Sequence, residues 1–309
     1  MTADMSFRAL LFGFLCVASA TSAGAKTDAD NGRRSVELAF TSIAFGQISR
    51  EDAQIVVQTW KERITEFFDT DIDGRVVIYD STEDAVRAVE AGRAMAITLF
   101  TFDFLAQQQN ADLTPAIVGV FADGHTTEKY VVVVRVGTST QNLADLRDTQ
   151  IRIGTPAENR LPLIWLDVAL QQQGLTSGRQ HARMQQAESS ASAILAVFFG
   201  QVQACIVTER ALQTQGELNP QIARELTVIA RSPGLLPTVV SFGPACDDST
   251  RVLMLAATTT LHQRPLGRQV LELFGLSRIR AFRDTDVQAT RELVAAYERW
   301  QQLSSTATP

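Results

Sequence analysis

The sequence predicts an α/β protein with mainly parallel sheets covered by helices. Short apolar, β-branched runs at residues 36–40, 75–79 and 95–99 are typical of strands, and segments with helical periodicity separate them. This strand–helix–strand order implies parallel strands joined by crossover helices. With 45% hydrophobic and 20% charged residues, the 309-residue chain has a globular composition and suffices for one large or two modest domains.

Capping signals mark the first two helices. Ser49, with Asp52 three residues later, has the pattern of a helix start, and Ser81 with Asp84 repeats it. Gly92 follows the last turn of the second helix, where glycine adopts the left-handed conformation at little cost. The first helix has one apolar face at helical spacing, formed by Ala53, Val56, Trp60, Ile64 and Phe67.

The same alternation continues to the end of the chain. Helices are predicted at about residues 161–173, 190–199 and 287–303, the first with Pro162 in its first turn. The apolar stripe of the last helix is typical of core packing rather than of a partner site. Further strands are predicted at residues 116–120, 130–135, 151–153, 204–207 and 227–230.

Residues 1–25 have the pattern of a secretory signal peptide. Arg8 precedes an apolar run at residues 9–20, and the segment ends in the small residues Ala23, Gly24 and Ala25. The run is shorter than the roughly 20 apolar residues that span a bilayer. We therefore expect cleavage and export to the periplasm, with a retained N-terminal anchor as the alternative.

Charge and motif content exclude several function classes. The 28 Lys and Arg residues against 34 Asp and Glu give a net charge of −6, which argues against a nucleic-acid partner. No Gly-x-Ser-x-Gly, His-Glu-x-x-His or Gly-x-x-x-x-Gly-Lys motif occurs, and the three histidines lie far apart. We therefore predict no enzyme activity, no catalytic residue, no metal site and no cofactor. A cleft hydrolase is the weakest alternative.

Two cysteines, Cys205 and Cys246, remain after the leader is removed. An oxidising compartment permits a disulfide between them. Cys205 also lies in an apolar run at residues 204–207, which is typical of a buried thiol. The sequence leaves both possibilities open.

Short motifs follow one another along most of the mature chain, and one of them occurs twice. The pattern AVxxGxxxA occurs twice, at residues 88–96 and 196–204. The other motifs lie at residues 38–42, 88–105, 130–135, 143–147, 151–154 and 228–233. In this order they resemble the periplasmic phosphate and phosphonate binding proteins of ABC importers, a branch of the type II solute-binding proteins.

The resemblance implies a two-lobed type II periplasmic-binding-protein fold. Each lobe would be a mainly parallel sheet flanked by helices, with two crossover strands at a hinge. Lobe 1 would combine residues 35–135 with residues 245–309, and lobe 2 would hold residues 136–244. Such a protein closes on a small molecule, presents it to a membrane permease and performs no chemistry. A monomer is expected.

The chain departs from this family where the ligand would bind. Family members have a Ser/Thr-rich turn after the strand that ends here at Ile153, so that hydroxyl and N–H groups hold an anion. Phe104 replaces a family tyrosine, and Ser190 replaces a family histidine. In this chain the turn contains four candidate ligand-binding residues, Thr155, Glu158, Asn159 and Arg160.

Other candidates follow the carboxyl ends of strands, where open α/β sheets bind ligands. They are Thr41, Ser42, Ser81 and Thr98. Hydroxyls and aromatic rings, together with an arginine that can pair with a carboxylate, suit a small anionic molecule, phosphonate-like or an organic carboxylate. Each residue also has a simpler structural interpretation: Ser81 and Ser190 as helix caps, and Phe104 as core.

The resemblance therefore implies a periplasmic solute-binding protein that serves an ABC permease. The alternative is a periplasmic sensing module that signals to a membrane receptor or kinase, since both functions use the same lobes.

Overall fold

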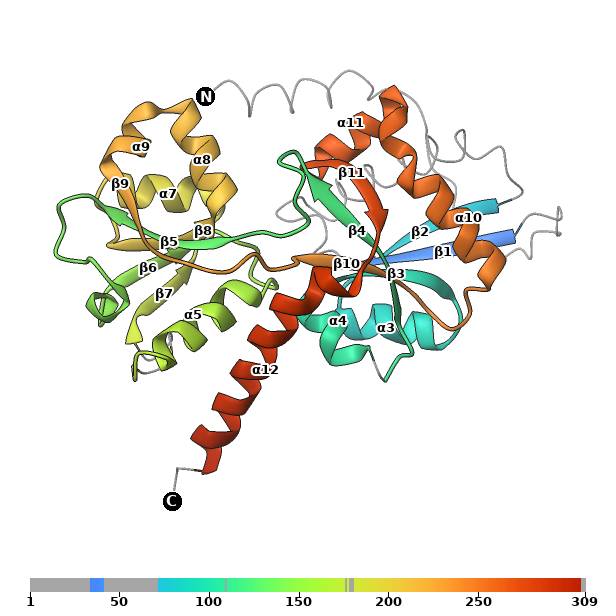
Figure 1. Ribbon diagram of the computed structural model, residues 1–309, viewed down its shortest axis with the longest axis horizontal. Helices are drawn as coiled ribbons and strands as arrows, with labels where there is room; N and C mark the ends of the chain where they lie inside the picture. Colours follow the sequence, from blue (N-terminus) through green and yellow to red (C-terminus); the bar gives the residue numbers. More distant parts are fainter. Residues whose placement is uncertain (1–33, 42–71, 109, 176, 178–180, 307–309) are drawn as a thin grey trace, which may run out of the picture. The chain divides into compact units, whose positions relative to one another are not determined.

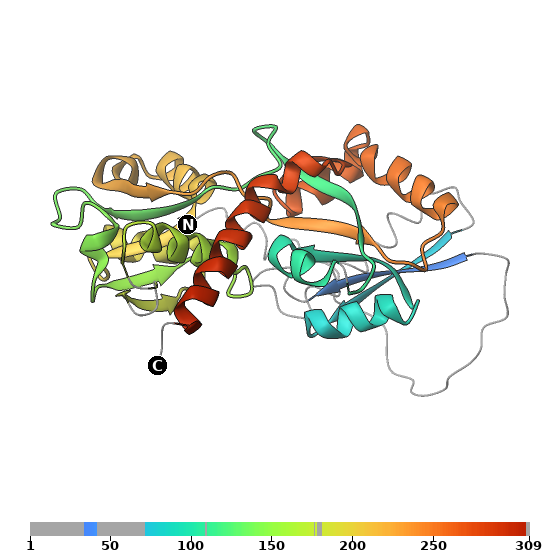
Figure 2. The same ribbon diagram turned by 60° about the horizontal axis from the view of Figure 1, so that its bottom comes forward.

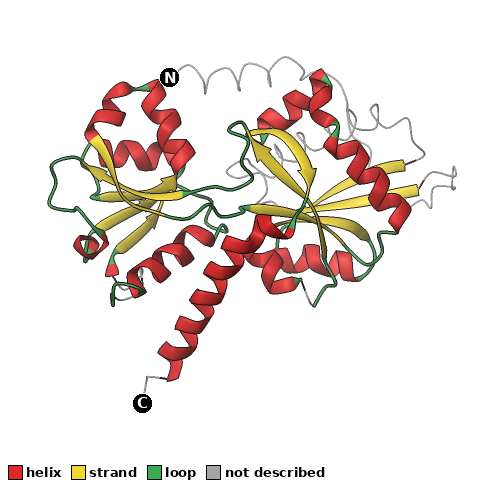
Figure 3. Cartoon of the chain, in the orientation of Figure 1, coloured by secondary structure: helices red, strands yellow, loops and turns green. Residues whose placement is uncertain are grey.

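The computed structural model describes residues 34–41, 72–108, 110–175, 177 and 181–306, and these form two β-sheets (Figure 1). The first sheet has the order β11 (Leu276–Ala281), β4 (Thr114–Phe121), β10 (Thr238–Phe242), β3 (Ala94–Phe100), β1 (Arg34–Thr41) and β2 (Ile72–Tyr79). The second sheet has the order β7 (Arg183–Gln186), β6 (Gln150–Ile153), β8 (Ala204–Thr208), β5 (Tyr130–Arg135) and β9 (Leu226–Arg231). Helices flank the strands of both sheets (Figure 3).

The strand directions follow from where the chain enters each sheet. β1 pairs in parallel with β2 and β3, as β6 does with β7 and β8, in agreement with the predicted crossovers. β5 and β10, which receive the chain from the other sheet, run antiparallel to both of their neighbours. β11 is also antiparallel to β4. Strands within the βαβ segments are therefore parallel, whereas the two strands at which the chain enters a sheet are antiparallel to their neighbours.

The chain passes between the sheets twice, through residues 122–129 and 232–237. These segments meet in an antiparallel bridge, where Glu128 and Leu235 exchange backbone hydrogen bonds of 2.8 Å in each direction. β5, placed by the resemblance in lobe 1, pairs within the second sheet, and β10, placed in lobe 2, pairs within the first. The chain thus passes from one sheet to the other at residues 122–129 and 232–237, and not at the lobe boundaries predicted after residues 135 and 244. The lobe division itself stays a prediction.

Helices α3 (Thr82–Glu90) and α4 (Thr101–Gln107) pack on one face of the first sheet around Ile97 and Leu99. Ser81 is the N-cap of α3, and Gly92 follows the helix with φ of 68°, so both predicted signals are confirmed. The helix predicted from Ser49 lies outside the described residues. The opposite face of the sheet carries α10 (Asp248–Thr259), η4 (Leu261–Gln263) and α11 (Pro265–Leu273).

The second sheet is covered by η3 (Leu143–Leu146), α5 (Leu161–Gln171), α7 (Ser190–Phe198), α8 (Glu209–Leu218) and α9 (Pro220–Glu225). The predicted helices at 161–173 and 190–199 correspond to α5 and α7. The predicted cap of α7 is wrong by one residue, because the Ser189 side chain accepts from the Ser192 amide. Ser190 is the first residue of the helix instead.

The C-terminal helix α12 (Asp284–Thr306) extends beyond the predicted 287–303. Its N-terminal part is fixed by a double hydrogen bond between Arg280 and Asp286. Further along, Leu293 and Tyr297 pack in the apolar cluster that contains α5, and α12 lies beside α5 in two views (Figures 1 and 2). The predicted core role of its apolar stripe is confirmed for Leu293 and Val294, which are buried, and for the partly buried Tyr297, whereas Leu303 at the end of the stripe is exposed.

The sequence patterns do not predict β7, β10 and β11. β7 is the polar run Arg-Met-Gln-Gln, and β11 contains Arg278 and Arg280, so neither has a strong apolar signal. β10 contains β-branched residues, but Pro237 lies directly before it, and proline is typical of a loop. These strands form because neighbouring strands supply their hydrogen-bond partners.

Cys205 in β8 and Cys246 before α10 are both free and buried, so the separate-thiol alternative holds. Burial raises the pKa of the Cys205 thiol, which keeps it in the unreactive protonated form. In the part of the chain that the structure describes, no helix combines the length and the apolar character of a membrane span. The signal peptide predicted at residues 1–25 lies outside that part.

Candidate ligand-binding site

A pocket of about 420 Å³ lies on the face of the first sheet and extends to residues that follow β6 in the second; we call it the sheet pocket. Strand residues from β1, β3, β4 and β10 form much of its wall, with apolar residues of α10 and α11 opposite. Residues toward the connections between the sheets include Phe100, Phe121, Glu128, Pro156, Asn159, Pro237 and Thr238.

The turn after β6 brings polar groups toward this pocket. The Gly154 amide donates to the Ile206 carbonyl over 2.8 Å, which continues the pairing of β6 with β8. Thr155 is buried, and its hydroxyl has no hydrogen-bond partner. An unpartnered buried hydroxyl costs free energy unless a ligand or water satisfies it. Thr155 itself is not among the residues that line the sheet pocket, but it directly precedes Pro156, which is, and its ligand-binding role stays a prediction.

Asn159 links the turn to the core of the second sheet. Its Nδ2 group donates to the Tyr130 hydroxyl over 2.9 Å, and its Oδ1 atom accepts from the Leu161 amide at the start of α5. Burial raises the pKa of Tyr130, so its hydroxyl is neutral and available for hydrogen bonding. Asn159 thus positions the N-terminal end of α5 and accepts the hydrogen bond of the first amide of this helix.

Ser190 is held by the same turn. Its hydroxyl donates to the Gly154 carbonyl over 2.5 Å, and its Cα lies 2.8 Å from where a Cβ at Gly154 would stand. Only a glycine permits this close approach between the end of β6 and the start of α7. Ser190 therefore has a structural role in this conformation, although not the predicted capping role.

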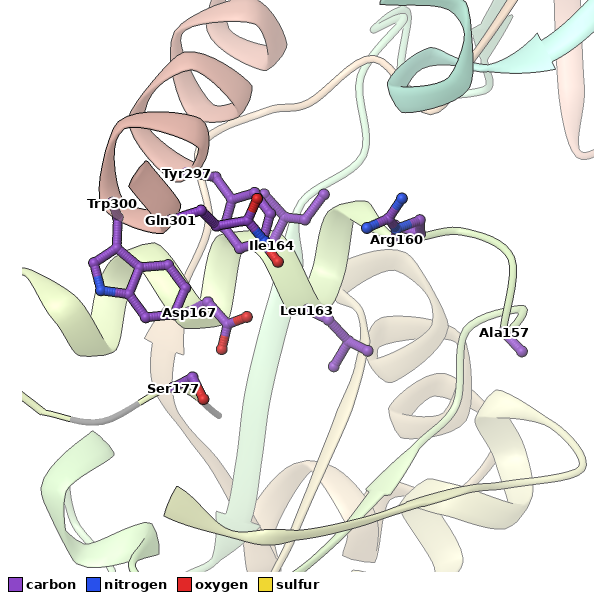
Figure 4. A pocket seen from close by; sticks show the side chains of 9 residues that line it. All are labelled: Ala157, Arg160, Leu163, Ile164, Asp167, Ser177, Tyr297, Trp300 and Gln301. Carbon is purple, nitrogen blue, oxygen red and sulfur yellow. The ribbon is translucent and has the colours of Figure 1, made fainter. Parts of the chain in front are cut away.

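Arg160 lies apart from the sheet pocket. Its guanidinium stacks 4.2 Å from the centre of the Phe102 ring, and it lines a second pocket of about 500 Å³ between α5 and α12. We call this pocket the helix groove; it is lined by Ala157, Arg160, Leu163, Ile164, Asp167, Ser177, Tyr297, Trp300 and Gln301 (Figure 4). Arg160 lies at one side of the groove, away from Trp300 (Figure 4).

Charge around Arg160 is partly compensated by a neighbouring carboxyl. Burial raises the pKa of Asp103, while attraction to Arg160 lowers it, and burial outweighs that attraction. Glu158, two residues before Arg160, is exposed. The four candidates of the turn thus separate, because Thr155 and Asn159 are buried and Glu158 and Arg160 point to solvent-accessible surface.

The candidates of the first sheet also separate. Thr98 lines the sheet pocket, and Thr41 is buried at the end of β1. Ser81 is engaged with Asp84, accepting from its amide and donating to its carboxylate. Phe104 is fully buried in the core of the first sheet, as its simpler interpretation expects. Ser42 lies outside the described residues.

A charged cluster at the connection between the sheets was missed by sequence reasoning. Arg210 of α8 donates from Nε to Glu128 over 3.0 Å and from a terminal nitrogen to Asp123 over 2.9 Å. Burial raises the pKa of Glu128 more strongly than Arg210 lowers it. The sequence contains one indication of this cluster. Glu128 lies just before the apolar strand at residues 130–135, in a segment without a helical pattern whose solvent-exposed face would explain the charge.

The family model for the periplasmic phosphonate substrate-binding protein of ABC transporters matches residues 45–287. The chain belongs to this family. It is thus the periplasmic substrate-binding component of an ABC transporter of the phosphonate type, with a small-molecule ligand and a membrane permease as partners. Membership favours transport over the sensory alternative, and the family is one of binding proteins rather than enzymes.

Solved structures confirm the type II periplasmic-binding fold. A binding protein component of an ABC phosphonate transporter from Pseudomonas aeruginosa matches with a TM-score of 0.63 and 13% identity, over 86% of this chain and 87% of that one. A Xanthomonas citri protein bound to ATP gives a TM-score of 0.64 and 14% identity, over 87% and 98%. PhnD1 from Prochlorococcus marinus, in complex with methylphosphonate, gives a TM-score of 0.59 and 12% identity, over 85% of this chain and 97% of that one. No curated protein sequence matches significantly.

Proposed function

We propose that this phosphonate-type binding protein captures a small organic solute with an anionic group in the sheet pocket and delivers it to the permease. The observation that carries the proposal is the lining of that pocket, because it combines strand ends of the first sheet with Pro156 and Asn159 from the turn after β6. Ligands of α/β sheets bind beyond the carboxyl ends of strands.

The anionic group is expected at the turn after β6. Thr155 has an unused hydroxyl there, and the Asn159 side chain lines the pocket. The apolar body of the solute would lie against rings such as Phe100 and Phe121. No lysine or arginine is among the described residues that line the sheet pocket. An organic anion therefore suits it better than inorganic phosphate, which has no apolar part to bury.

Capture would involve closing around the two connections at residues 122–129 and 232–237. A short antiparallel bridge at Glu128 and Leu235 joins them, and a few residues of this kind are sufficient to absorb a hinge rotation. The two lobes would then be the two sheets with their helices. Closure would exclude water from the solute and strengthen its polar contacts.

A thermal-shift screen followed by calorimetry tests the proposal. Methylphosphonate, ethanesulfonate, propionate and inorganic phosphate would be compared, and at least one organic anion should raise the melting temperature by mass action. Asn159→Ala should weaken its binding by about tenfold or more, since one charge-assisted hydrogen bond contributes roughly 1.5–3 kcal/mol. Small-angle scattering with and without that compound should show compaction.

The outcome against the proposal is clear-cut. If none of the organic anions stabilises the protein, or if Asn159→Ala binds them as the wild type does, the sheet pocket is not their site. Glu158→Ala is the matched control, because Glu158 lies in the same turn but is exposed.

Export and oligomeric state complete the proposed function. We expect the mature protein to begin near residue 26 after signal cleavage and to act as a monomer. Mass spectrometry of the exported protein and size-exclusion chromatography with light scattering check these two expectations.

A further inference from the structure

We infer that the helix groove binds a second small molecule, an aromatic monocarboxylate whose carboxylate pairs with Arg160 and whose ring lies against Tyr297 and Trp300. This second site goes beyond the proposed function, because the described linings of the helix groove and the sheet pocket share no residue. The volume of the groove, about 500 Å³, lies within the range of small-molecule pockets.

Arg160 supplies a positive charge that no described residue uses. Among the residues that the structure describes, none forms a hydrogen bond or an ion pair with its guanidinium, and Asp103 attracts it only from a distance. The guanidinium stacks 4.2 Å from the centre of the Phe102 ring, which holds the planar group in place. Its N–H donors are therefore available to a carboxylate, which arginine binds through two parallel hydrogen bonds.

The opposite end of the groove is aromatic. Tyr297 and Trp300 lie about one turn apart on α12, and their ring centres are 5.8 Å apart at an interplanar angle of 45°. Leu163 and Ile164 of α5 add apolar surface to the wall between the two ends (Figure 4). Such a surface favours a flat ring, which gains both from burial and from contact with the aromatic side chains.

The walls of the groove are held in place by contacts outside it. α5 and α12 pack together in one apolar cluster, in which Leu166 and Leu293 are buried. The Leu236 amide also donates to the Thr290 hydroxyl over 2.9 Å, which fixes α12 to the second connection between the sheets. A preformed groove needs little ordering when a ligand binds, so more of the contact energy appears as affinity.

The spacing of its two ends determines the size and the orientation of the ligand. Arg160 and Asp167 are about 10 Å apart along α5, at 1.5 Å per residue, and Asp167 lies with Trp300 at the end away from Arg160 (Figure 4). A ring joined to its carboxylate by a short aliphatic arm spans this length better than benzoate does. The carboxylate of Asp167 repels a second anionic group, so a monoanion with its charge at Arg160 fits best.

Calorimetry with four compounds at neutral pH tests this assignment. They are 3-phenylpropionate, its uncharged analogue 3-phenylpropanamide, the ring-free butyrate and the shorter benzoate. The wild type should bind 3-phenylpropionate about tenfold or more tightly than each of the others, a difference of about 1.4 kcal/mol per tenfold. In Arg160→Gln the advantage over the amide should fall to about twofold or less, and in Trp300→Ala the advantage over butyrate should fall likewise.

Arg299→Gln provides the matched control. Arg299 directly precedes Trp300 on α12 and is exposed, but it is not among the described residues that line the groove. Its replacement removes the same charge as Arg160→Gln, so the preference for 3-phenylpropionate over the amide should persist. Circular dichroism and melting temperature establish that the three variants fold.

Three results would overturn the assignment: binding of 3-phenylpropionate no tighter than that of its amide, an unchanged preference in Arg160→Gln, or an equal loss in Arg299→Gln. If Asn159→Ala abolishes the binding of 3-phenylpropionate and Arg160→Gln does not, the compound occupies the sheet pocket and the assignment to the groove is wrong. None of these results removes the proposed function, which is tested with smaller anions and with Asn159→Ala.

Discussion

The sheet pocket and the helix groove are lined by neighbouring residues of the turn after β6, and they differ in polarity. Asn159 is buried and lines the sheet pocket, whose wall is largely apolar. Arg160 is exposed and lines the helix groove, together with Asp167 and Trp300. The comparison shows that a cluster of polar residues in sequence need not form one site. The turn before α5 sends neighbouring side chains to different surfaces.

The difference also bears on anion recognition. Arginine is the usual partner of a carboxylate or phosphonate, and the sequence offers Arg160 for this role. In the structure Arg160 stacks on Phe102 and faces the helix groove. The sheet pocket instead offers hydroxyl and amide groups and the carboxylate of Glu128, and no arginine or lysine is among its described lining residues.

The largest effect is expected for Gly154→Ala, which disturbs the turn that leads to both pockets. A Cβ there would lie 2.8 Å from Ser190 Cα, 2.9 Å from Ala193 Cβ and 2.9 Å from Val207 Cγ1. Overpacking costs about 1–3 kcal/mol, and a backbone atom among the contacts favours the upper end, about 3 kcal/mol. The urea midpoint should fall accordingly.

Gly216→Ala is the control for this change. Its Cβ would meet Ala223 Cβ at 3.3 Å within the helical layer, and the free energy of unfolding should change by less than about 1 kcal/mol. Similar losses in the two variants would show that the close approach at Gly154 is not a special constraint.

An intermediate effect is expected for Asn159→Ala, and a comparison with Arg160→Ala distinguishes the roles of these two neighbouring residues. The change leaves the fully buried Tyr130 hydroxyl without its donor, at a cost of about 2 kcal/mol in the free energy of unfolding. Arg160→Ala removes one exposed ring contact and should cost about 0.5–1 kcal/mol. Denaturant titrations of both variants measure the difference.

A Tyr130→Phe background sharpens this test. Without the hydroxyl, Asn159→Ala should cost distinctly less than in the wild type, because the lost hydrogen bond is already absent. Equal costs in the two backgrounds would contradict the proposed role of Asn159 in holding the turn.

The smallest effect is expected for Asp286→Asn, at the start of the helix that forms one wall of the helix groove. Burial acts to raise the pKa of Asp286, but hydrogen bonds from the Arg280 side chain and the Arg283 amide lower it below its ordinary value of 3.8. The folded state therefore binds the proton less tightly than the unfolded state. The resulting stabilisation is present above about pH 4 and disappears as the pH falls through the lowered pKa.

Asp286→Asn should thus lose about 1 kcal/mol at pH 7 and progressively less below pH 3.8. Melting curves of the variant and the wild type across this range measure the difference. A difference that does not depend on pH would mean that the lost contact is steric rather than ionic.

Much of the fold could be predicted from local patterns. The strands at β1 to β6, β8 and β9, and the helices α3, α5, α7 and α12, all have apolar periodicity or capping signals of their own. β7 and β11 lack such signals because they are polar strands that depend on their neighbours for hydrogen bonds. The reversal of β5 and β10 could not be predicted either, because it depends on which sheet each strand enters.

The candidate site was predictable only in part. A strand end followed by short polar residues marks the turn after β6, and in the structure this turn contributes Pro156 and Asn159 to the sheet pocket, while its ligand-binding role stays a prediction. The separation of Asn159 from Arg160 depends on a few backbone angles before α5, which residue types do not specify. Glu128 was missed because its surroundings come from α8 and from the connection at Leu235, both far away in sequence.

By itself, the amino-acid sequence determined the α/β class, the family resemblance, and most helix and strand positions, because these depend on interactions between residues close together in the chain. Only the tertiary structure decided which polar side chains share a pocket, that the two cysteines are separate, and that a carboxylate rather than an arginine supplies the charge of the sheet pocket. Those properties arise from contacts between distant segments, which no local pattern records.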